Sequence, residues 1–223
     1  MPLQAMRDDT SHQLKTEKPN WPDWSGMTAV CMATGPSLTA SQVQVVKSAS
    51  VRAIAINDMG LQSRGINAHW ADIWYAADSL FWSTYEAQAQ ASSALKVCAE
   101  RQPIDAGFVD LLLSVKADHE DKARQFMPGY AISGGHSGFQ ALQLAISLGA
   151  SKVVLLGYDC KSQGNKTNYF GVKHGSLNKT SSYKNWPACY ASLKLPEGVE
   201  VVNCTPGSAI KAYRFEEIGE CLA

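Results

Sequence analysis

Short apolar runs, each ending in glycine or polar residues, alternate with amphipathic stretches from Thr28 to the end of the chain. Runs that are apolar at almost every position are typical of parallel strands, because helices cover both faces of such a sheet. The runs occupy residues 28–34, 52–56, 72–76, 95–98, 152–156 and 200–203, with residues 111–115 as a further candidate. The sequence therefore predicts an α/β fold with a mostly parallel, twisted sheet and helices on both faces.

Helical patterns fill the connections between these runs. The predicted helices cover residues 39–47, 79 to about 90, 137–148, 183–193 and about 215–221. The third is the clearest, because Leu142, Ala145 and Ile146 fall on one stripe. Ser137 is expected to be its N-cap and Gly149 its stop.

The length of 223 residues, 45% of them hydrophobic, is enough for one sizeable core. Residues 1–26 are mostly polar and are predicted to form a flexible tail whose Trp21 and Trp24 dock on the body. Residues 27–223 are predicted to be a single nucleotide-binding α/β domain. Residues 160–182 are polar and too long for an ordinary connection, so a mobile loop or lid is expected there.

Charge and apolar content exclude several classes of protein. Twenty basic residues balance twenty acidic ones, which argues against bulk electrostatic binding of nucleic acid. No stretch approaches the roughly 20 apolar residues of a membrane span, and the first residues lack the apolar region of a secretory signal. The scattered cysteines form no CxxC pair, so a soluble protein in a reducing cytoplasm is expected. A homo-oligomer remains open, because the tryptophans suit an interface as well as a core.

Ligands of open parallel sheets bind at the carboxyl ends of the strands, so the residues at those ends carry the functional prediction. The turn Thr34-Gly35-Pro36-Ser37 follows the first strand and opens a helix. Gly35 allows close backbone approach, while Ser37 and the helix amides offer donors to a phosphate. The alternative is an ordinary Gly-Pro turn with Ser37 as a cap. The turn matches neither the dinucleotide fingerprint nor the P-loop.

A second glycine-rich helix opening contains Gly135, His136, Ser137 and Gly138. Its free amides are suited to an anion, and Ser137 is able to donate to it. His136 is expected to touch the ligand. The alternative is tight packing of this helix on the sheet.

Polar residues also end three other strands: Asn57 and Asp58, then Asp78, then Asp159. Such carboxylates hold Mg²⁺, orient a ribose hydroxyl or cap the next helix. The sequence contains no zinc-like spacing of His and Cys and no DxD pair, so no metal ligand is assigned.

His174 lies in the long polar loop, which also carries lysines suited to phosphates. A histidine over the carboxyl edge of the sheet is suited to act as a general base, because its pKa lies near neutral pH. The alternative is a solvated loop histidine.

Several segments together resemble a widespread group of phage and prophage proteins: AVCMATGPSL, AINDMG, ADIWYAADSLFW, SGGHSGFQALQLAISLGASKVVLLGYD, HGSLN and VVNCTPGSAIKAYRFEEI. That group is similar to two enzyme families with one modified Rossmann fold. One is the bacterial sialyltransferases of glycosyltransferase family 42, and the other is the hydroxymethylpterin pyrophosphokinase-like family. The shared order covers about residues 28–215.

Resemblance to the sialyltransferases implies a GT-A-like domain that transfers a sugar from a nucleotide-sugar donor, with inversion and without a metal. It implies that the loop at Gly35 and Ser37 holds the nucleotide, although Thr34 stands where the family has Asn. Asn57 would contact the donor, and His174 would be the general base. Ser137 and Gly138 match the family's helix opening near the nucleotide, and the segment from Cys204 to Ser208 resembles a C-terminal motif of that family.

Resemblance to the pyrophosphokinase-like family implies instead a transfer that depends on ATP and Mg²⁺ through Asp78. The second aspartate of that family's motif is missing, because Leu80 follows Ser79. A third hypothesis is a nucleotide-binding protein without catalysis. The leading hypothesis is the glycosyltransferase-like enzyme, with Asp78 and Asp159 orienting ribose or acceptor. The acceptor stays open between a glycan, a modified nucleobase and a small metabolite.

Overall fold

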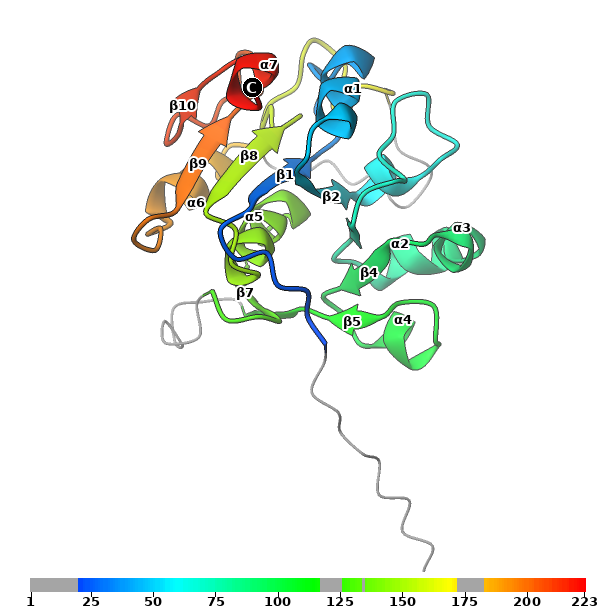
Figure 1. Cartoon of the computed structure of the whole chain (residues 1–223). Helices are drawn as coiled ribbons and strands as arrows, with labels where there is room; N and C mark the ends of the chain where they lie inside the picture. Colours follow the sequence, from blue (N-terminus) through cyan, green and yellow to red (C-terminus); the bar gives the residue numbers. More distant parts are fainter. Residues whose placement is uncertain (1–19, 117–125, 134, 172–182) are drawn as a thin grey trace, which may run out of the picture.

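The computed structural model describes residues 20–116, 126–133, 135–171 and 183–223 (Figure 1). The strands are β1 (Thr28–Met32), β2 (Arg52–Ile56), β3 (Ile73–Tyr75), β4 (Leu95–Cys98), β5 (Leu111–Leu112), β6 (Ser114–Lys116), β7 (Tyr130–Ile132), β8 (Lys152–Leu156), β9 (Glu200–Asn203) and β10 (Arg214–Phe215). Within these residues, eight strands form one sheet in the order β10-β9-β8-β1-β2-β3-β4-β5, and β6 pairs with β7. Every pair of these strands is parallel, which confirms the predicted α/β class.

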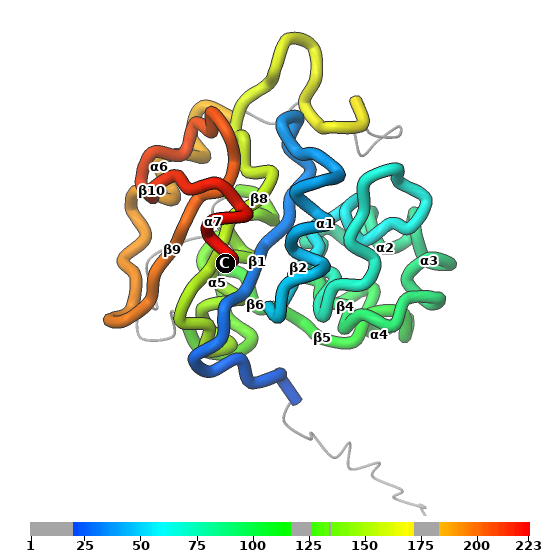
Figure 2. The backbone as a smooth tube through the Cα atoms, turned by 45° about the horizontal axis from the view of Figure 1, so that its top comes forward, coloured from blue at the N-terminus to red at the C-terminus, as the bar shows by residue number. Residues whose placement is uncertain are grey.

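The helical elements are α1 (Ala40–Ser48), the 3-10 turn η1 (Asn57–Gly60), α2 (Ser79–Thr84), α3 (Glu86–Ala91), α4 (Gln102–Asp105), α5 (Ser137–Ser147), α6 (Trp186–Ser192) and α7 (Ile218–Cys221). They cover both faces of the sheet, with α1 and α7 in contact on one face and α5 against β1, β2 and β8 on the other (Figures 1 and 2). Helices on both faces are therefore confirmed.

Two apolar cores flank the sheet because successive strand residues point to opposite faces. In β1, Ala29 and Cys31 join the core under α5, whereas Val30 and Met32 join the core under α1, α2 and α7. The strand β8 divides its residues between the two cores in the same way. This double burial explains why both central strands are apolar at nearly every position.

The chain changes direction across the sheet at its first strand. From β1 it builds β2, β3, β4 and β5 outward on one side, and it later returns to place β8, β9 and β10 on the other side. The strands β1 and β8 are therefore neighbours, and the chain continues from β1 toward one edge of the sheet and from β8 toward the other. Such a switch point opens a crevice at the carboxyl edge of the sheet.

Helix α1 shows how local sequence sets an element boundary. Thr39 is its N-cap, and the hydroxyl of Thr39 accepts from the amide of Gln42, whose side chain accepts from the amide of Thr39. This reciprocal capping box satisfies two of the amides that a helix start leaves unpaired.

Helix α5 begins one residue earlier than the capping prediction required, because Ser137 as N-cap would make Gly138 the first helical residue. His136 is the N-cap, with an extended backbone and no capping bond from its side chain, whereas Ser137 is the first helical residue and is buried. At the other end, Gly149 has a φ of 96°, a left-handed conformation that glycine adopts without steric cost. The prediction of Gly149 as the stop is therefore confirmed, and the prediction of Ser137 as the N-cap is wrong.

Other boundaries differ from the prediction for local reasons. The helix expected over residues 79–90 breaks at Tyr85, because the hydroxyls of Ser83 and Thr84 donate to the carbonyl of Leu80 and compete with the helix ladder. The run at residues 111–115 divides between two sheets as β5 and β6. The last two helices are shorter than predicted, and Phe215 belongs to β10.

The segment before β1 packs against the body in its described part. Trp24 is 2% exposed, and its amide donates to the carbonyl of Leu148 at 2.7 Å. A Cβ on Gly129 would touch the indole of Trp21. Both tryptophans of the expected tail therefore contact the domain. No helix in the described ranges is long and apolar enough to cross a membrane.

Candidate functional site

A cleft of about 630 Å³ lies at the carboxyl ends of β1, β2, β3 and β8. It collects residues that are distant in the sequence, as expected for the switch point of a parallel sheet. The sequence-predicted residues that line it are Thr34, Gly35, Pro36, Asn57, Asp78, Gly135, His136, Ser137, Gly138 and Asp159. Ser37 does not line the cleft but is hydrogen-bonded to Asp159, which does. Asp58 does not line the cleft, and His174 lies outside the described residues.

The loop after β1 is held tightly to the loop after β8. The amide of Gly35 donates to the carbonyl of Gly157 at 2.9 Å. A Cβ on Gly35 would overlap that carbonyl and the carboxylate of Asp159. Glycine is therefore required at position 35 by close packing.

Asp159 holds this loop in place. Its carboxylate accepts from the amide of Ser37 at 3.2 Å and from the hydroxyl of Ser37 at 3.0 Å. The side chain is 3% exposed, and burial raises its pKa above the ordinary value, while the bonds from Ser37 oppose that rise. Asp159 thus positions the Gly35–Ser37 turn, a role that sequence reasoning did not assign to it.

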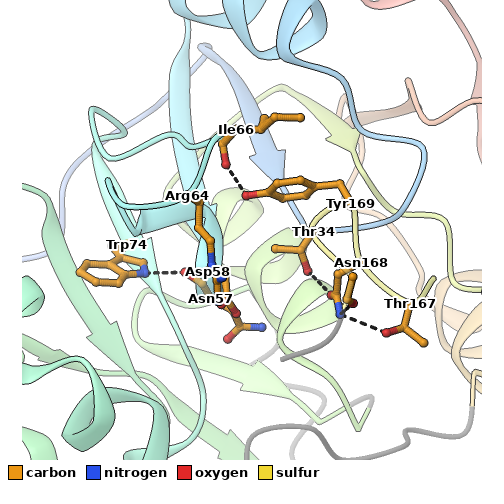
Figure 3. Close-up of polar contacts among 10 residues, drawn as sticks. Thr34, Asn57, Asp58, Arg64, Ile66, Trp74, Thr167, Asn168 and Tyr169 are labelled. Atoms are coloured by element: carbon orange, nitrogen blue, oxygen red, sulfur yellow. Dashed lines mark hydrogen bonds and ion pairs between the residues drawn. The ribbon is translucent and has the colours of Figure 1, made fainter. Parts of the chain in front are cut away.

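The segment after β8 forms a side wall of the cleft through Asn165, Thr167 and Asn168. Figure 3 shows its polar contacts with Thr34. The hydroxyl of Thr34 donates to Oδ1 of Asn168 at 2.8 Å, and Nδ2 of Asn168 donates to the hydroxyl of Thr167 at 3.1 Å. The amide of Tyr169 also donates to the carbonyl of Thr34. Thr34 therefore anchors this wall. Sequence reasoning missed Asn168 and Thr167, because nothing in a polar loop marks which amide becomes buried.

Asn57 and Asp58 diverge although they are neighbours. Asn57 lines the cleft in a left-handed conformation with a φ of 53°, and its carbonyl accepts from the indole of Trp74 at 2.8 Å (Figure 3). Asp58 is 1% exposed and forms an ion pair with Arg64 at 2.5 Å (Figure 3). Asp58 was expected to bind the nucleotide, but it does not line the cleft and instead forms an ion pair with Arg64.

Arg64 extends this ion pair to the side wall of the cleft. Its guanidinium lies 4.1 Å from the ring centroid of Phe170, an attractive cation–π arrangement. The hydroxyl of Tyr169 donates to the carbonyl of Ile66 (Figure 3). The buried pair therefore supports the segment that Thr34 also holds.

Replacing Arg64 with alanine is expected to lower the free energy of unfolding by about 3–5 kcal/mol, because the buried carboxylate of Asp58 loses its ion pair with Arg64. Arg52 provides the matched control, since it pairs with Asp72 at 3.0 Å and the two side chains are 42% and 34% exposed, against 20% and 1% for Arg64 and Asp58. Arg52→Ala should cost no more than about 1 kcal/mol. Urea unfolding of the three proteins checks this, and equal losses would contradict a stabilising role for the buried pair.

The start of α5 forms the back of the cleft. His136 stacks on Trp186, with ring centroids 4.3 Å apart and 26° between the planes. Burial lowers the pKa of His136 from 6.5 to about 3, so its imidazole is neutral at physiological pH. Ser137 and Gly138 follow it at the positive end of an 11-residue helix. Any positive field here therefore comes from backbone amides and not from the histidine.

His136 also predicts an acid-side loss of stability. A histidine whose folded pKa is lowered takes up a proton in the unfolded chain first, so stability falls as pH drops from about 6.5 towards about 3. His136→Phe keeps the stacked ring and removes this contribution. Unfolding free energies measured across this range should fall less steeply in the variant. Above pH 7 the difference between the proteins should stay constant, and identical slopes at acid pH would refute the assignment.

Two carboxylates lie at the mouth of the cleft. Asp78 and Glu100 follow β3 and β4, both are exposed, and both line the cleft. The amide of Ser79 donates to Oε2 of Glu100 at 2.9 Å, and Asp78 makes no capping bond to α2. Asp78 is therefore not the side-chain cap of this helix. Among the described side chains, no group of three His, Cys, Asp or Glu residues is arranged to hold a metal ion.

The remaining wall of the cleft is aromatic. Tyr183, Trp186 and Tyr190 line it from α6 and the residues just before that helix. Their spacing of three and four residues is that of one helix face, a pattern visible in the sequence but equally typical of core. Sequence reasoning did not assign them to the site. Lys161 lines the cleft beside the end of β8.

Comparison with known proteins gives two solved structures of similar fold. The sialyltransferase CstII from Campylobacter jejuni, in complex with a substrate analogue, cytidine-5'-monophosphate, aligns with a TM-score of 0.55 and 14% identity over 87% of each chain. A structure of the sialyltransferase CST-II with trisaccharide acceptor and CMP aligns with a TM-score of 0.52 and 14% identity, covering 84% of this chain and 85% of the other.

No family model matches the sequence, and no curated protein is similar to it at a significant level. At 14% identity the two structures establish similarity of fold. The chain thus has the α/β fold of the sialyltransferase structures, as the resemblance in the sequence implied.

Proposed function

We propose that the chain is a glycosyltransferase-like enzyme, which binds a nucleotide sugar in the cleft and transfers the sugar to an acceptor hydroxyl. The observation that supports this is the convergence of three strand-end elements in one cleft: the Gly35 turn, Asn57 and the start of α5 at Ser137. The same fold occurs in sialyltransferase structures solved with CMP and with a trisaccharide acceptor.

In this proposal the start of α5 binds the phosphate. Amides at a helix N-terminus point at an anion, and the helix dipole favours negative charge there. Ser137 and Gly138, the first two residues of this helix, both line the cleft. Lys161 would add the positive charge. The turn at Gly35 and the amide side chain of Asn57 would contact the nucleoside.

The proposed reaction needs one proton transfer. The acceptor oxygen forms a bond to the anomeric carbon, the bond from that carbon to the phosphate oxygen breaks, and the hydroxyl proton passes to a base. We assign the base to His174, which follows the cleft residue Asn168 by six positions, a chain length sufficient to reach the cleft. Asp78 would orient ribose or acceptor. The phosphate leaves with its new negative charge balanced by the helix amides and Lys161.

A thermal-shift panel tests nucleotide binding directly. The purified chain is screened against CMP, CDP, UDP, GDP, ADP, ATP and common nucleotide sugars, with and without Mg²⁺. A ligand at 100 times its dissociation constant stabilises the folded chain by about 2.7 kcal/mol. We expect one nucleotide and its sugar conjugate to raise the melting temperature in the absence of Mg²⁺. No shift with any nucleotide would refute the proposal.

A second candidate function is pyrophosphoryl transfer from ATP with Mg²⁺. It is favoured by one observation, the position of Asp78 and Glu100 together at the cleft mouth, because carboxylate oxygens and substrate phosphates are the ligands that Mg²⁺ prefers. In that case only ATP with Mg²⁺ would shift the melting temperature, and EDTA would abolish activity. The sugar transfer proposed above should survive EDTA.

A further inference from the structure

Two polar atoms in the back wall of the cleft are buried without a hydrogen-bonding partner. Within the described parts of the chain, Nε2 of His136 and the hydroxyl of Tyr190 make no hydrogen bond. Both residues line the cleft, and their ring centroids are 5.5 Å apart. Tyr190 is 0% exposed. Buried polar side chains normally have partners, so two such atoms on neighbouring rings that line the cleft indicate a place for a ligand group.

The surroundings of these atoms are aromatic. Trp186 stacks on His136, and Phe139 meets Tyr190 edge-to-face at 5.2 Å. Tyr183 stands at right angles to Trp186 at 4.8 Å. We call Tyr183, Trp186, Tyr190 and His136 the aromatic wall.

The aromatic wall carries no charge of its own. The charged residues that line the cleft, Asp78, Glu100, Asp159 and Lys161, follow strands β3, β4 and β8. A phosphate is best held by cations and helix amides, and the side chains of the aromatic wall supply neither. A neutral imidazole and a phenol instead donate to and accept from hydroxyl groups, beside aromatic faces that cover apolar C–H groups.

We propose that the aromatic wall binds a hydroxyl-bearing sugar ring, with His136 Nε2 and the Tyr190 hydroxyl hydrogen-bonded to its hydroxyl groups. This deepens the proposed function and rests on it for the source of the ring, either the transferred sugar or the acceptor. The low pKa of His136, about 3, keeps this recognition independent of pH around neutrality.

Saturation-transfer NMR on the full chain tests the proposal. The probes are the methyl glycosides of glucose, galactose and N-acetylglucosamine, each recorded without and with CMP. His136→Phe keeps the stack on Trp186 and removes both ring nitrogens, and Tyr190→Phe removes only the hydroxyl. Tyr130→Phe is the matched control, because its hydroxyl is also buried and has no hydrogen-bonding partner among the described residues, but Tyr130 does not line the cleft.

Saturation transfer to at least one sugar is expected in the wild-type protein. Loss of one neutral hydrogen bond should lower the affinity for that sugar about threefold to tenfold in each cleft variant, and Tyr130→Phe should leave the affinity unchanged. Competition by CMP-N-acetylneuraminic acid but not by CMP would assign the ring to the donor, and competition by neither would assign it to the acceptor.

Two outcomes would overturn the sugar subsite: no transfer to any sugar in the wild-type protein, or equal transfer in all four proteins. Circular dichroism verifies that each variant is folded, and Tyr190→Phe decides alone if His136→Phe is not. The CMP signal reports separately on the proposed function. CMP binding with a sugar signal unaffected by both cleft variants would reject the subsite and leave the nucleotide site standing.

Discussion

Replacing His174 with alanine is expected to lower kcat about 10²–10⁴-fold while nucleotide affinity stays within about twofold. A general base acts only as the acceptor hydroxyl loses its proton, so its removal raises the barrier to transfer and leaves donor binding intact. The measurement is a transfer assay with the donor that the nucleotide panel selects, together with calorimetric titration of the same nucleotide. The two numbers separate catalysis from binding.

His69 supplies the matched control for this variant. It bonds Asn67 through Nδ1 in the loop after η1, and it does not line the cleft. His69→Ala should therefore keep both turnover and nucleotide affinity. Unchanged turnover in His174→Ala would remove His174 from the base role. Nucleotide binding without turnover in the wild-type protein would favour a binding protein without catalysis.

Replacing Gly35 with alanine should weaken nucleotide binding about 100-fold or more, equivalent to about 2.7 kcal/mol. The added Cβ overlaps the Gly157 carbonyl and the Asp159 carboxylate, so the turn after β1 has to move away from the loop after β8. That movement breaks the bond from the Gly35 amide and displaces Ser37 from Asp159. Overpacking of this kind also costs about 1–3 kcal/mol of stability.

Calorimetric titration and urea unfolding of Gly35→Ala measure these two effects. Gly219→Ala is the matched control, because a Cβ there meets nothing within 4 Å in helix α7. It should leave nucleotide affinity unchanged and raise stability by up to about 1 kcal/mol, since alanine has the higher helix propensity. Wild-type affinity in Gly35→Ala would show that the turn does not contact the nucleotide.

Much of the sheet is readable in the sequence, because residues buried on both faces must be apolar at nearly every position. The strands β2, β4, β8 and β9 occur at the predicted residues. Boundaries failed where short polar side chains compete for backbone groups, as at Ser83 and Thr84. The apolar runs locate these strands, although β1 and β3 are shorter than their runs, whereas the ends of helices depend on individual hydrogen bonds.

The edge of the sheet where the cleft lies was also predictable. Parallel strands bring their carboxyl ends to one edge, so the polar residues after them had to gather there. Gly35, Asn57 and Asp78 meet in the cleft for that reason. The exception is Asp58, because the 3-10 turn η1 follows β2 directly and buries this carboxylate against Arg64.

The sequence by itself therefore determined a parallel α/β sheet and the edge at which polar residues collect. Only the tertiary structure decided which of those residues face the cleft and which hold its walls. The partners Thr34 and Asn168 are 134 positions apart, and Ser37 and Asp159 are 122 apart. The strict alternation of strand residues ends where the strands end, so beyond those points only packing between distant loops directs a side chain.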